Sequence, residues 1–412
     1  MLIIYRFLIN LVLLISPLIL IVRFIKKKED PLRFKEKIGF FDKQKKLGKL
    51  IWFHGASVGE LQSIVPLIEK LEKNKTIKQI LVTSNTLSSS KVLKINKFNK
   101  VVHQFFPIDS NFLIKRFLNY WKPSKALFID SEFWPNTIIQ LKQNKIPIIL
   151  INGRITKKTF KRWNKFPNFS QKIFSKFDLC LSSSKESFGY LKRLKFKNVK
   201  FLGNLKFSQS ELKNLDIKKS LKNFLSNKKT WCASSTHHPE ELFVAQAHKI
   251  LKKKIKNLIT IIIPRHAERY ASIKNDLEKL NLKIHLDKPS KKIDPETDIY
   301  LVNSYGNTKS FYKNCNNIFL GGSLVKHGGQ NPLEAARYGC SIINGPNVQN
   351  FREIYEFLKK NRISTYIKKN NELIDQLNIL FNKQSNSKMI QSKIKMIGDE
   401  ILKKTYNEIF VK

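Results

Sequence analysis

The sequence is short of acidic residues. Its 412 residues include 31 Asp and Glu against 77 Lys and Arg, so the formal net charge is +46. This surplus suits an acidic partner, whether nucleic acid, an anionic lipid or a phosphorylated substrate. Lysine is spread along the whole chain, however, so a lysine-rich composition with solvated side chains explains the surplus equally well. Charge alone therefore does not identify the partner.

Cysteine is also scarce, and several familiar motifs are missing. No CxxC or HExxH occurs, and most of the cysteines lie in or beside apolar runs, which predicts buried, reduced thiols with neither a disulfide framework nor a zinc site. Without GxGxxG or GxxxxGK[ST], a dinucleotide enzyme or a P-loop ATPase loses its usual support. The pair His237–His238 before Pro239 is more typical of a helix entrance than of a metal site. The four cysteines are Cys180, Cys232, Cys315 and Cys340.

The amino terminus holds the longest apolar run. Residues 2–25 supply about the 20 residues that a tilted membrane helix needs, although Arg6 and Pro17 interrupt the pattern. No small-residue cleavage site follows, which argues against a signal peptide. A single span and a monotopic anchor both fit better than a buried core helix. Basic residues after the run, from Arg23 to Lys28, place the main body in the cytoplasm.

Beyond residue 28, apolar runs alternate with helical patterns, and a hydrophobic content of 42% is normal for a globular protein. Each run ends in small or polar residues, as buried parallel strands do when their carboxyl-end loops face a ligand. The pattern predicts two Rossmann-like α/β domains that face a ligand cleft, joined by a polar, lysine-rich linker. The predicted segments are a membrane anchor (1–28), an N-terminal Rossmann-like domain (29–207), a linker region (208–229), and a C-terminal Rossmann-like domain with C-terminal helices (230–412).

The first such strand end is HGASVGE, residues 54–60. Gly55 and Gly59 allow a tight turn, and Glu60 falls where a helix begins, where the helix dipole favours a charged carboxylate. An ionised acid held near a bound hydroxyl can serve as a general base. Acids also decorate helix starts for structural reasons alone, so this motif by itself leaves both interpretations open.

Two further segments of the first half carry candidate charges. In FIDSEFWPN, Asp130 and Glu132 would point the same way if the strand persists, which is unfavourable without a nearby cation. A turn with two solvated acids is the structural alternative. In GNLKF, Lys206 lies between apolar residues after a glycine, where it could stabilise developing negative charge.

The second half offers phosphate-binding features. In IIIPRHAER the chain leaves a strand through Pro264 to Arg265, a residue that can bind phosphate with two parallel hydrogen bonds. In GGSLVKHGGQNPLEAARYG, Asn331, Pro332 and Glu334 predict a helix start with a capping box. The four glycines of residues 321–329 suggest in addition a close approach by a ligand such as a nucleotide.

Taken together and in order, these segments resemble the Kdo transferases, inner-membrane enzymes that attach 3-deoxy-D-manno-octulosonic acid (Kdo) to a lipid A precursor. The resemblance covers nearly the whole chain. It includes the anchor, HGASVGE, DSEFWPN, NGRIT, GNLKF, ASSTHHPEE, PRHAER, GGSLVKHGGQNPLEAA and GPNVQNF. It implies a GT-B fold, CMP-Kdo as donor, an inverting reaction, and no metal or cofactor.

The resemblance also implies roles for individual residues. Glu60 would take the proton from the acceptor hydroxyl, and Asp130 and Lys206 would stabilise the transition state. Asp130 stands where the family usually has glutamate, so Glu132 could share its role; Gln330 replaces a common histidine, and Asn307 a common acid. The residues that would bind CMP are Pro264, Arg265, Tyr305, Gly306, Asn307, Asn331, Pro332, Leu333 and Glu334.

Two rival functions fit parts of the sequence. Another GT-B transferase with a UDP-sugar donor would share the fold. A membrane-tethered, basic nucleic-acid-binding protein would explain the charge, but no aromatic and basic residues interleave in a recognisable nucleic-acid motif. The resemblance therefore favours an enzyme whose partners are CMP-Kdo, a lipid A precursor (the tetraacylated lipid IVA) and the cytoplasmic face of the inner membrane.

Overall fold

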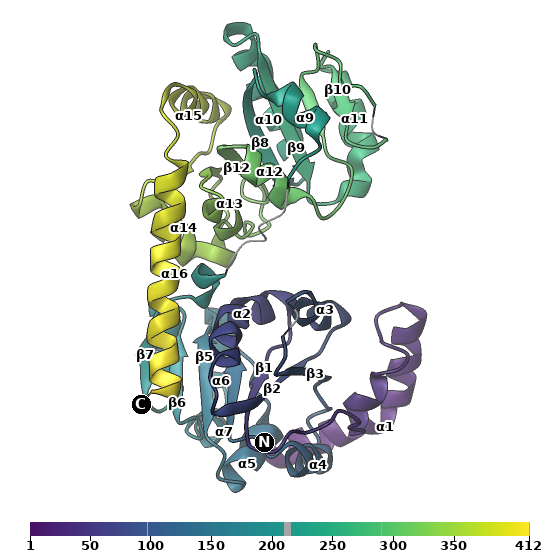
Figure 1. The fold of residues 1–412 in the computed structure, drawn as a ribbon, viewed down its shortest axis with the longest axis vertical. Helices are drawn as coiled ribbons and strands as arrows, with labels where there is room; N and C mark the ends of the chain where they lie inside the picture. Colours follow the sequence, from purple (N-terminus) through teal and green to yellow (C-terminus); the bar gives the residue numbers. More distant parts are fainter. Residues whose placement is uncertain (97, 210–215, 290, 412) are drawn as a thin grey trace. The chain divides into compact units, whose positions relative to one another are not determined.

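The computed structural model describes residues 1–96, 98–209, 216–289 and 291–411 (Figure 1). The chain forms two compact units. Unit 1 holds Met1–Ser210 together with Ile397–Lys412, and unit 2 holds Glu211–Met396. Each unit is built on its own parallel sheet.

The sheet of unit 1 has seven parallel strands in the order β3-β2-β1-β4-β5-β6-β7. The order reverses between β1 and β4, so these two neighbours are followed by connections that leave in opposite directions along the sheet. The strands are β1 (Lys49–His54), β2 (Ile77–Ser84), β3 (Val101–Phe105), β4 (Lys125–Ile129), β5 (Ile148–Gly153), β6 (Leu179–Ser182) and β7 (Val199–Phe201).

Helices cover the sheet of unit 1, and large aromatic side chains fill the space between the layers. In this core the ring centroid of Trp52 lies 4.9 Å from that of Phe117 and 5.6 Å from that of Phe128. The helices are α1 (Leu2–Ile25), η1 (Phe34–Ile38), α2 (Val58–Glu72), α3 (Leu87–Ile95), α4 (Asn111–Trp121), α5 (Pro135–Gln143), α6 (Lys157–Asn164), α7 (Pro167–Phe174), α8 (Lys185–Arg193) and η2 (Leu205–Ser208).

Unit 2 repeats the architecture with strand order β10-β11-β9-β8-β12-β13-β14, which reverses between β8 and β12. Its strands are β8 (Lys229–Thr236), β9 (Leu258–Pro264), β10 (Ile284–Leu286), β11 (Ile299–Leu301), β12 (Asn317–Leu320), β13 (Ser341–Asn344) and β14 (Ser364–Tyr366). Its helices are α9 (Lys219–Leu225), α10 (Glu240–Lys254), η3 (Ala267–Arg269), α11 (Tyr270–Glu278), α12 (Thr308–Asn314), α13 (Leu333–Arg337), η4 (Gln349–Phe351), α14 (Arg352–Lys360) and α15 (Asn370–Asn382).

The predicted alternation of parallel strands and helices beyond residue 28 is confirmed, and all four cysteines are buried as expected. The structure adds strands that the pattern missed. In β3, His103 and Gln104 interrupt the apolar run, but both find partners: Gln104 accepts a hydrogen bond from Trp121 Nε1 (2.9 Å), and His103 Nε2 lies 2.8 Å from Ser84 Oγ. Polar residues with such partners are compatible with a buried strand.

The last helix, α16 (Ser387–Phe410), begins in unit 2 and ends in unit 1. Near its start Gln391 donates a hydrogen bond to the Tyr338 carbonyl, and near its end Glu408 forms a 2.7 Å ion pair with Lys200. The predicted assignment of residues 230–412 to one domain differs from this division, because a helical pattern does not reveal which core the helix packs on.

The predicted linker, residues 208–229, is only partly described, since residues 210–215 lie outside the described residues. Within it, α9 is a helix of unit 2 and buries Leu221.

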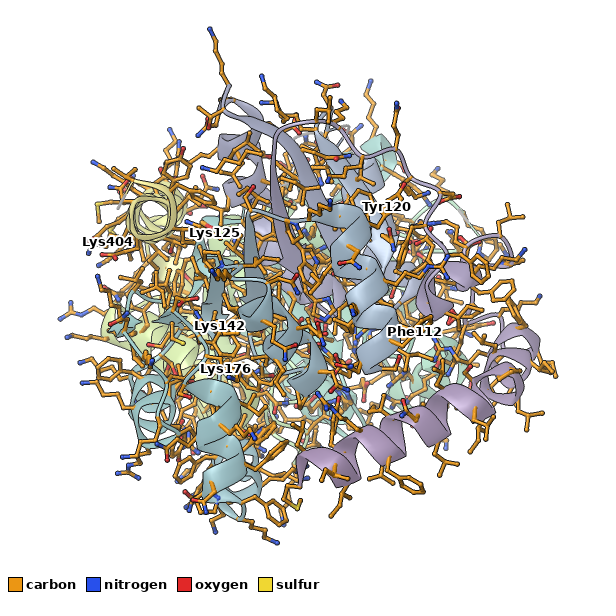
Figure 2. The ribbon with its side chains drawn as sticks, turned by 90° about the horizontal axis from the view of Figure 1, so that it is seen from below. Phe112, Tyr120, Lys125, Lys142, Lys176 and Lys404 are labelled. Carbon is orange, nitrogen blue, oxygen red and sulfur yellow. The ribbon has the colours of Figure 1, made fainter. Side chains whose placement is uncertain are left out.

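The apolar amino-terminal run forms the single helix α1, as predicted. Among the described residues it is the one helix long and apolar enough to cross a membrane. Figure 2 shows it lying along unit 1, on the same side as the exposed Phe112 of α4. Only Ser16 of α1 is buried, and most of its large apolar side chains are exposed.

Candidate functional site

Glu60 lies at the start of α2, directly after β1, as the sequence predicts. Ser57 caps the helix by accepting a hydrogen bond from the Glu60 N–H (3.3 Å). The Glu60 carboxylate accepts hydrogen bonds from the Ala56 N–H (2.7 Å) and from the Ser57 hydroxyl (2.8 Å). The side chain is thus folded back over the loop, so its position is fixed by the turn itself.

Gly55 explains why this turn needs a glycine. A Cβ atom at this position would lie 2.8 Å from Cδ1 of Ile129 and 3.3 Å from Cβ of Glu60. Ile129 is the last residue of β4, so the glycine lets the loop after β1 close onto the end of the neighbouring strand. The Glu60 loop and the Asp130 loop consequently leave adjacent strand ends, where the strand order reverses.

Asp130 is the first residue after β4, and it has a positive φ of 55°. This left-handed conformation is uncommon outside glycine, but aspartate and asparagine adopt it more readily than most residues. The Asp130 carboxylate accepts a hydrogen bond from Asn152 Nδ2 (2.5 Å), and its other oxygen lies 3.5 Å from Lys206 Nζ. The structure therefore brings together the two residues predicted to act on the transition state.

Asn152 holds Asp130 and the segment of Lys206 in place. It lies in β5, also has a positive φ (53°), and accepts a hydrogen bond from the Leu205 N–H (2.8 Å) through its Oδ1. One buried amide thereby bridges Asp130 to the segment that carries Lys206. Asn152 is not among the predicted site residues; the signal for it in the sequence is the amide at a strand end in the NGRIT segment.

Glu132 points elsewhere. The prediction that Asp130 and Glu132 share a direction required the strand to persist, and the left-handed Asp130 ends it. Glu132 lies 3.3 Å from Nε2 of the buried His54 and accepts a hydrogen bond from Trp134 Nε1 (2.9 Å). Burial acts to raise the pKa of Glu132, but the hydrogen bond and charge of His54 hold it below its ordinary value.

Electrostatics single out Glu60 among these acids. Burial raises its pKa to about 7, and the negative charges of Asp130 and Glu132 act in the same direction. The hydrogen bonds from Ser57 and Ala56 oppose the shift only in part. A carboxylate with a pKa near neutrality exchanges protons efficiently at physiological pH. The arrangement can therefore remove a proton from a hydroxyl bound at this strand edge.

In unit 2 the predicted CMP-binding residues lie at or after the carboxyl ends of three strands, β9, β11 and β12. Pro264 ends β9 and Arg265 follows it; residues 305–307 follow β11; residues 331–334 follow β12, and α13 starts at Leu333. Tyr305 contacts the segment that follows Arg265, because its hydroxyl accepts a hydrogen bond from the Ala267 N–H (3.3 Å) and donates one to Glu268.

The buried Glu240, at the start of α10, organises the loop after β12. Its carboxylate accepts four backbone hydrogen bonds of 2.7–3.1 Å, and three of them come from consecutive residues of the GGSL segment. The donors are the N–H groups of His237, Gly322, Ser323 and Leu324. The glycines were expected to admit a ligand, yet at Gly321 a Cβ would lie 2.6 Å from the backbone of Ser235 and Thr236 and 2.8 Å from Glu240 Oε2, so this glycine admits a neighbouring part of the chain. The sequence predicts a helix entrance at His237–Pro239 but does not show that the glutamate after it binds this loop.

The predicted capping box at residues 331–334 does not form. Helix α13 starts at Leu333 with Pro332 as its N-cap residue, one position later than predicted. Asn331 still accepts a hydrogen bond from the Leu333 N–H (3.2 Å). Because proline lacks a side-chain acceptor, Asn331 caps from outside the helix, and Glu334 lies in its first turn.

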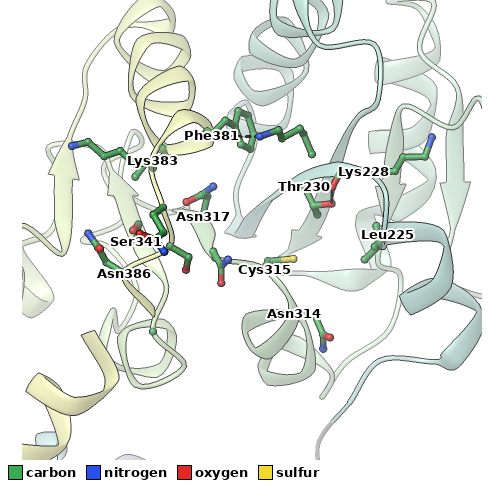
Figure 3. Close-up of a pocket in the computed structure, with 16 residues that line it drawn as sticks. Leu225, Lys228, Thr230, Asn314, Cys315, Asn317, Ser341, Phe381, Lys383 and Asn386 are labelled. Carbon is green, nitrogen blue, oxygen red and sulfur yellow. Dashed lines mark hydrogen bonds between the residues drawn. The ribbon is translucent and has the colours of Figure 1, made fainter. Parts of the chain in front are cut away.

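A hollow of about 290 Å³ in unit 2 lies at the opposite edge of the sheet, at the amino ends of β8, β12 and β13 (Figure 3). Thr230, Asn317 and Ser341 line it, together with residues 383–386 after α15. It contains none of the residues predicted to bind CMP. Ligands of open α/β sheets bind outside the carboxyl ends of the strands, so this hollow is on the wrong edge to be their site.

Known structures share this architecture. The UDP-GlcNAc 2-epimerase from Neisseria meningitidis superposes with a TM-score of 0.56 at 15% identity, covering 86% of this chain and 100% of that one. At this identity the likeness concerns the fold alone. Two parallel Rossmann-like units with this topology define a fold of the GT-B type.

The sequence comparisons are more specific. A family model described as 3-deoxy-D-manno-octulosonic-acid transferase (kdotransferase) matches residues 32–209. The 3-deoxy-D-manno-octulosonic acid transferase of Rickettsia bellii is 33% identical over 408 residues, 97% of either chain. The enzyme of that name from Haemophilus influenzae is 30% identical over 75% of this chain and 73% of its own. The chain belongs to the Kdo transferase family of glycosyltransferases.

Proposed function

We propose that this protein transfers Kdo from CMP-Kdo to a hydroxyl of a tetraacylated lipid A precursor, lipid IVA, at the cytoplasmic face of the inner membrane. The observation that carries the proposal is the Glu60 carboxylate. It lies at the strand-order reversal of unit 1, its pKa is about 7, and the chain around it belongs to the Kdo transferases.

The proposed reaction is a single inverting displacement. The acceptor hydroxyl attacks the anomeric carbon of Kdo and gives its proton to Glu60. The bond from this carbon to the phosphate oxygen breaks, and CMP departs with the electron pair. The reaction consumes no cofactor, because CMP-Kdo is itself a substrate.

Asp130 and Lys206 would act on the charge that develops during transfer. The Lys206 ammonium lies 3.5 Å from Asp130, whose loop leaves the strand end next to that of the Glu60 loop. A preorganised ammonium stabilises negative charge on the substrate without reorganising during the reaction. Asp130 is shorter than the family's glutamate, and its left-handed backbone and its bond to Asn152 fix its reach.

CMP would be bound at the carboxyl edge of the sheet in unit 2. Arg265 is exposed beside the Tyr305 loop, and Gly306 has a positive φ of 94° with open space where a Cβ would be. The start of α13, with Asn331 and Glu334, would contact the nucleoside. These loops supply a cation and polar groups suited to a nucleotide phosphate and ribose.

The test is purified full-length protein with CMP-Kdo and lipid IVA in detergent, followed by mass spectrometry of the lipid. Addition of Kdo is the expected result. UDP-sugars are assayed in parallel, and transfer from one of them without transfer from CMP-Kdo would replace the proposed donor. Salt-sensitive binding to DNA without any sugar transfer would instead favour the nucleic-acid function.

Replacement of the base tests the assignment of Glu60. We expect Glu60→Ala to abolish transfer while the fold is retained, and Glu60→Gln to do the same with the helix start better preserved, because glutamine can still accept one of the two hydrogen bonds. Near-normal turnover by either variant would remove Glu60 from the mechanism. Circular dichroism of each variant serves as the control for folding.

A further inference from the structure

Helix α1 is fastened to unit 1 at both of its ends. Near its start the Tyr5 hydroxyl donates a hydrogen bond to the buried Asp109 (2.7 Å), and Arg6 donates one to Asn136 (3.0 Å). Near its end Arg23 forms a 2.8 Å ion pair with the buried Glu29. The second fastening also reaches the body of unit 1, since Lys37 pairs with Glu29 and donates to the Asn85 carbonyl.

These fastenings are incompatible with a helix that crosses the bilayer. Tyr5 and Arg23 are separated by roughly 27 Å along the helix axis, close to the thickness of the hydrocarbon core. Their partners Asp109 and Glu29 belong to the same folded unit and cannot lie on opposite sides of a membrane. The exposed apolar side chains of α1, such as Leu14 and Leu18, then face lipid while the helix lies in the membrane surface.

Between the two fastenings, α1 does not close onto the body of unit 1. A mostly apolar slot of about 320 Å³ remains, which is about twice the volume of an engineered cavity that binds benzene. Its charged lining residues belong to the two fastenings: Arg23, Glu29 and Lys37 to one, and Asp109 to the other. One face of α1 forms its roof, with side chains at three- and four-residue spacing. These are Ile9, Val12, Ser16, Ile19, Leu20 and Arg23.

The opposite wall of the slot leads to the candidate site. Phe106 and Trp134 line the slot, and their rings lie 4.1 and 6.4 Å from the His54 ring, measured between centroids. Trp134 donates its hydrogen bond to Glu132. The charge of Glu132 in turn helps raise the pKa of Glu60. The slot therefore runs from a lipid-facing helix to the side chains that flank the proposed base.

We propose that this slot binds one acyl chain of the lipid acceptor, with α1 lying in the membrane surface as its roof. The inference rests on the proposed function, because it takes the acceptor to be an acylated lipid. An apolar slot beside a membrane helix suits a hydrocarbon chain, and its proximity to His54 and Glu132 selects the chain of the reacting lipid over that of a bystander. A chain held there would keep its sugar headgroup near Glu60.

Ser16 allows the slot to be filled from within. It is the buried residue of α1, and its hydroxyl bonds to the Leu13 carbonyl, so only a small side chain borders the slot. We expect Ser16→Phe to raise the KM for lipid IVA at least tenfold, with the KM for CMP-Kdo within twofold of wild type. The matched control is Leu14→Phe on the exposed face of the same helix, which should leave both values unchanged.

A fully deacylated, soluble form of the acceptor separates this inference from the proposed function. If the slot binds a chain, Ser16→Phe and wild type should use the deacylated acceptor equally well. An unchanged KM for lipid IVA, or an equal loss on both acceptors, would overturn the slot proposal. Transfer by the wild-type enzyme would remain established in either case.

Fluorescence quenching identifies the occupant directly. Lipid IVA with a brominated acyl chain should quench tryptophan emission, and Trp134→Phe should remove most of that quenching. Quenching by brominated phosphatidylglycerol that lipid IVA does not displace would assign the slot to bulk lipid and refute the proposal.

Discussion

Ionisation of the buried Glu60 carboxylate is predicted to destabilise the folded protein. Its pKa is about 7 in the folded chain against an ordinary value of 4.5. The folded state therefore binds the proton more tightly than the unfolded state, and stability falls as the pH rises from about 4.5 through 7. The full difference corresponds to about 3 kcal/mol above pH 7. Glutamine does not ionise, so it never places a charge in this buried position. Glu60→Gln should therefore recover most of this free energy of unfolding.

The net gain is smaller, because glutamine cannot accept both the Ala56 and Ser57 hydrogen bonds as an anion does. With about 1 kcal/mol for the lost bond, we expect Glu60→Gln to raise the free energy of unfolding of unit 1 by about 2 kcal/mol at pH 8, and to leave it unchanged or slightly lowered near pH 4.5. Four of the five tryptophans lie in unit 1, so tryptophan emission during urea unfolding reports on this unit.

The proposed role of Glu60 as a base makes the rate of transfer depend on the same pKa. If Glu60 must be ionised to accept the proton, the wild-type kcat/KM should rise about tenfold between pH 6 and pH 8. A stability difference between wild type and Glu60→Gln that does not change with pH would refute the assigned pKa. A wild-type rate that is flat between pH 6 and 8, alongside an inactive Glu60→Gln, would show that Glu60 acts in some way other than as a base.

Three further predictions concern residues that hold the sites in place. Asn152→Ala removes the amide that fixes Asp130, and should lower kcat for Kdo transfer 10- to 100-fold with the KM for CMP-Kdo unchanged; an equal rise in that KM would contradict a role confined to unit 1. Glu240→Ala leaves four backbone N–H groups without their acceptor, and should destabilise unit 2 by more than 3 kcal/mol in thermal unfolding; a shift of under 1 kcal/mol would show that water replaces the carboxylate. Tyr5→Phe removes one donor to the buried Asp109, and should increase proteolysis of α1 in detergent by roughly fivefold, whereas wild-type resistance would show that the other fastenings suffice.

The sequence predicted most of the site in unit 1 because local rules determine it. The glycine turn after β1 and the acid at the start of α2 follow from strand and helix patterns, and Glu60 lies where they predict. The shape of the loop at Asp130 did not follow from these patterns. The strand was predicted to include Asp130, but it ends at Ile129. Left-handed backbone at a non-glycine residue depends on tertiary partners, here Asn152 and Lys206, which lie distant in the sequence.

Glu240 in unit 2 is a second residue whose contacts could not be predicted from the sequence. Four glycines in nine residues indicated close approach, but the sequence could not say what approaches. A glutamate about 80 residues earlier accepts the backbone hydrogen bonds of this loop. The glycine content therefore indicated an unusual backbone in the loop after β12, but only the fold shows that Glu240 is the group that binds it.

The path of α16 bears on how the chain is made. Unit 1 is discontinuous: its last segment, from Ile397 onward, follows the roughly 190 residues of unit 2. At the usual speed of a ribosome this delay is about 10 to 40 s. Throughout that time the nascent core of unit 1 lacks the ion pair from Lys200 to Glu408 and the helix that packs at Gly203. Its apolar surface is then open to chaperones, and completion of this core waits for the segment from Ile397 onward.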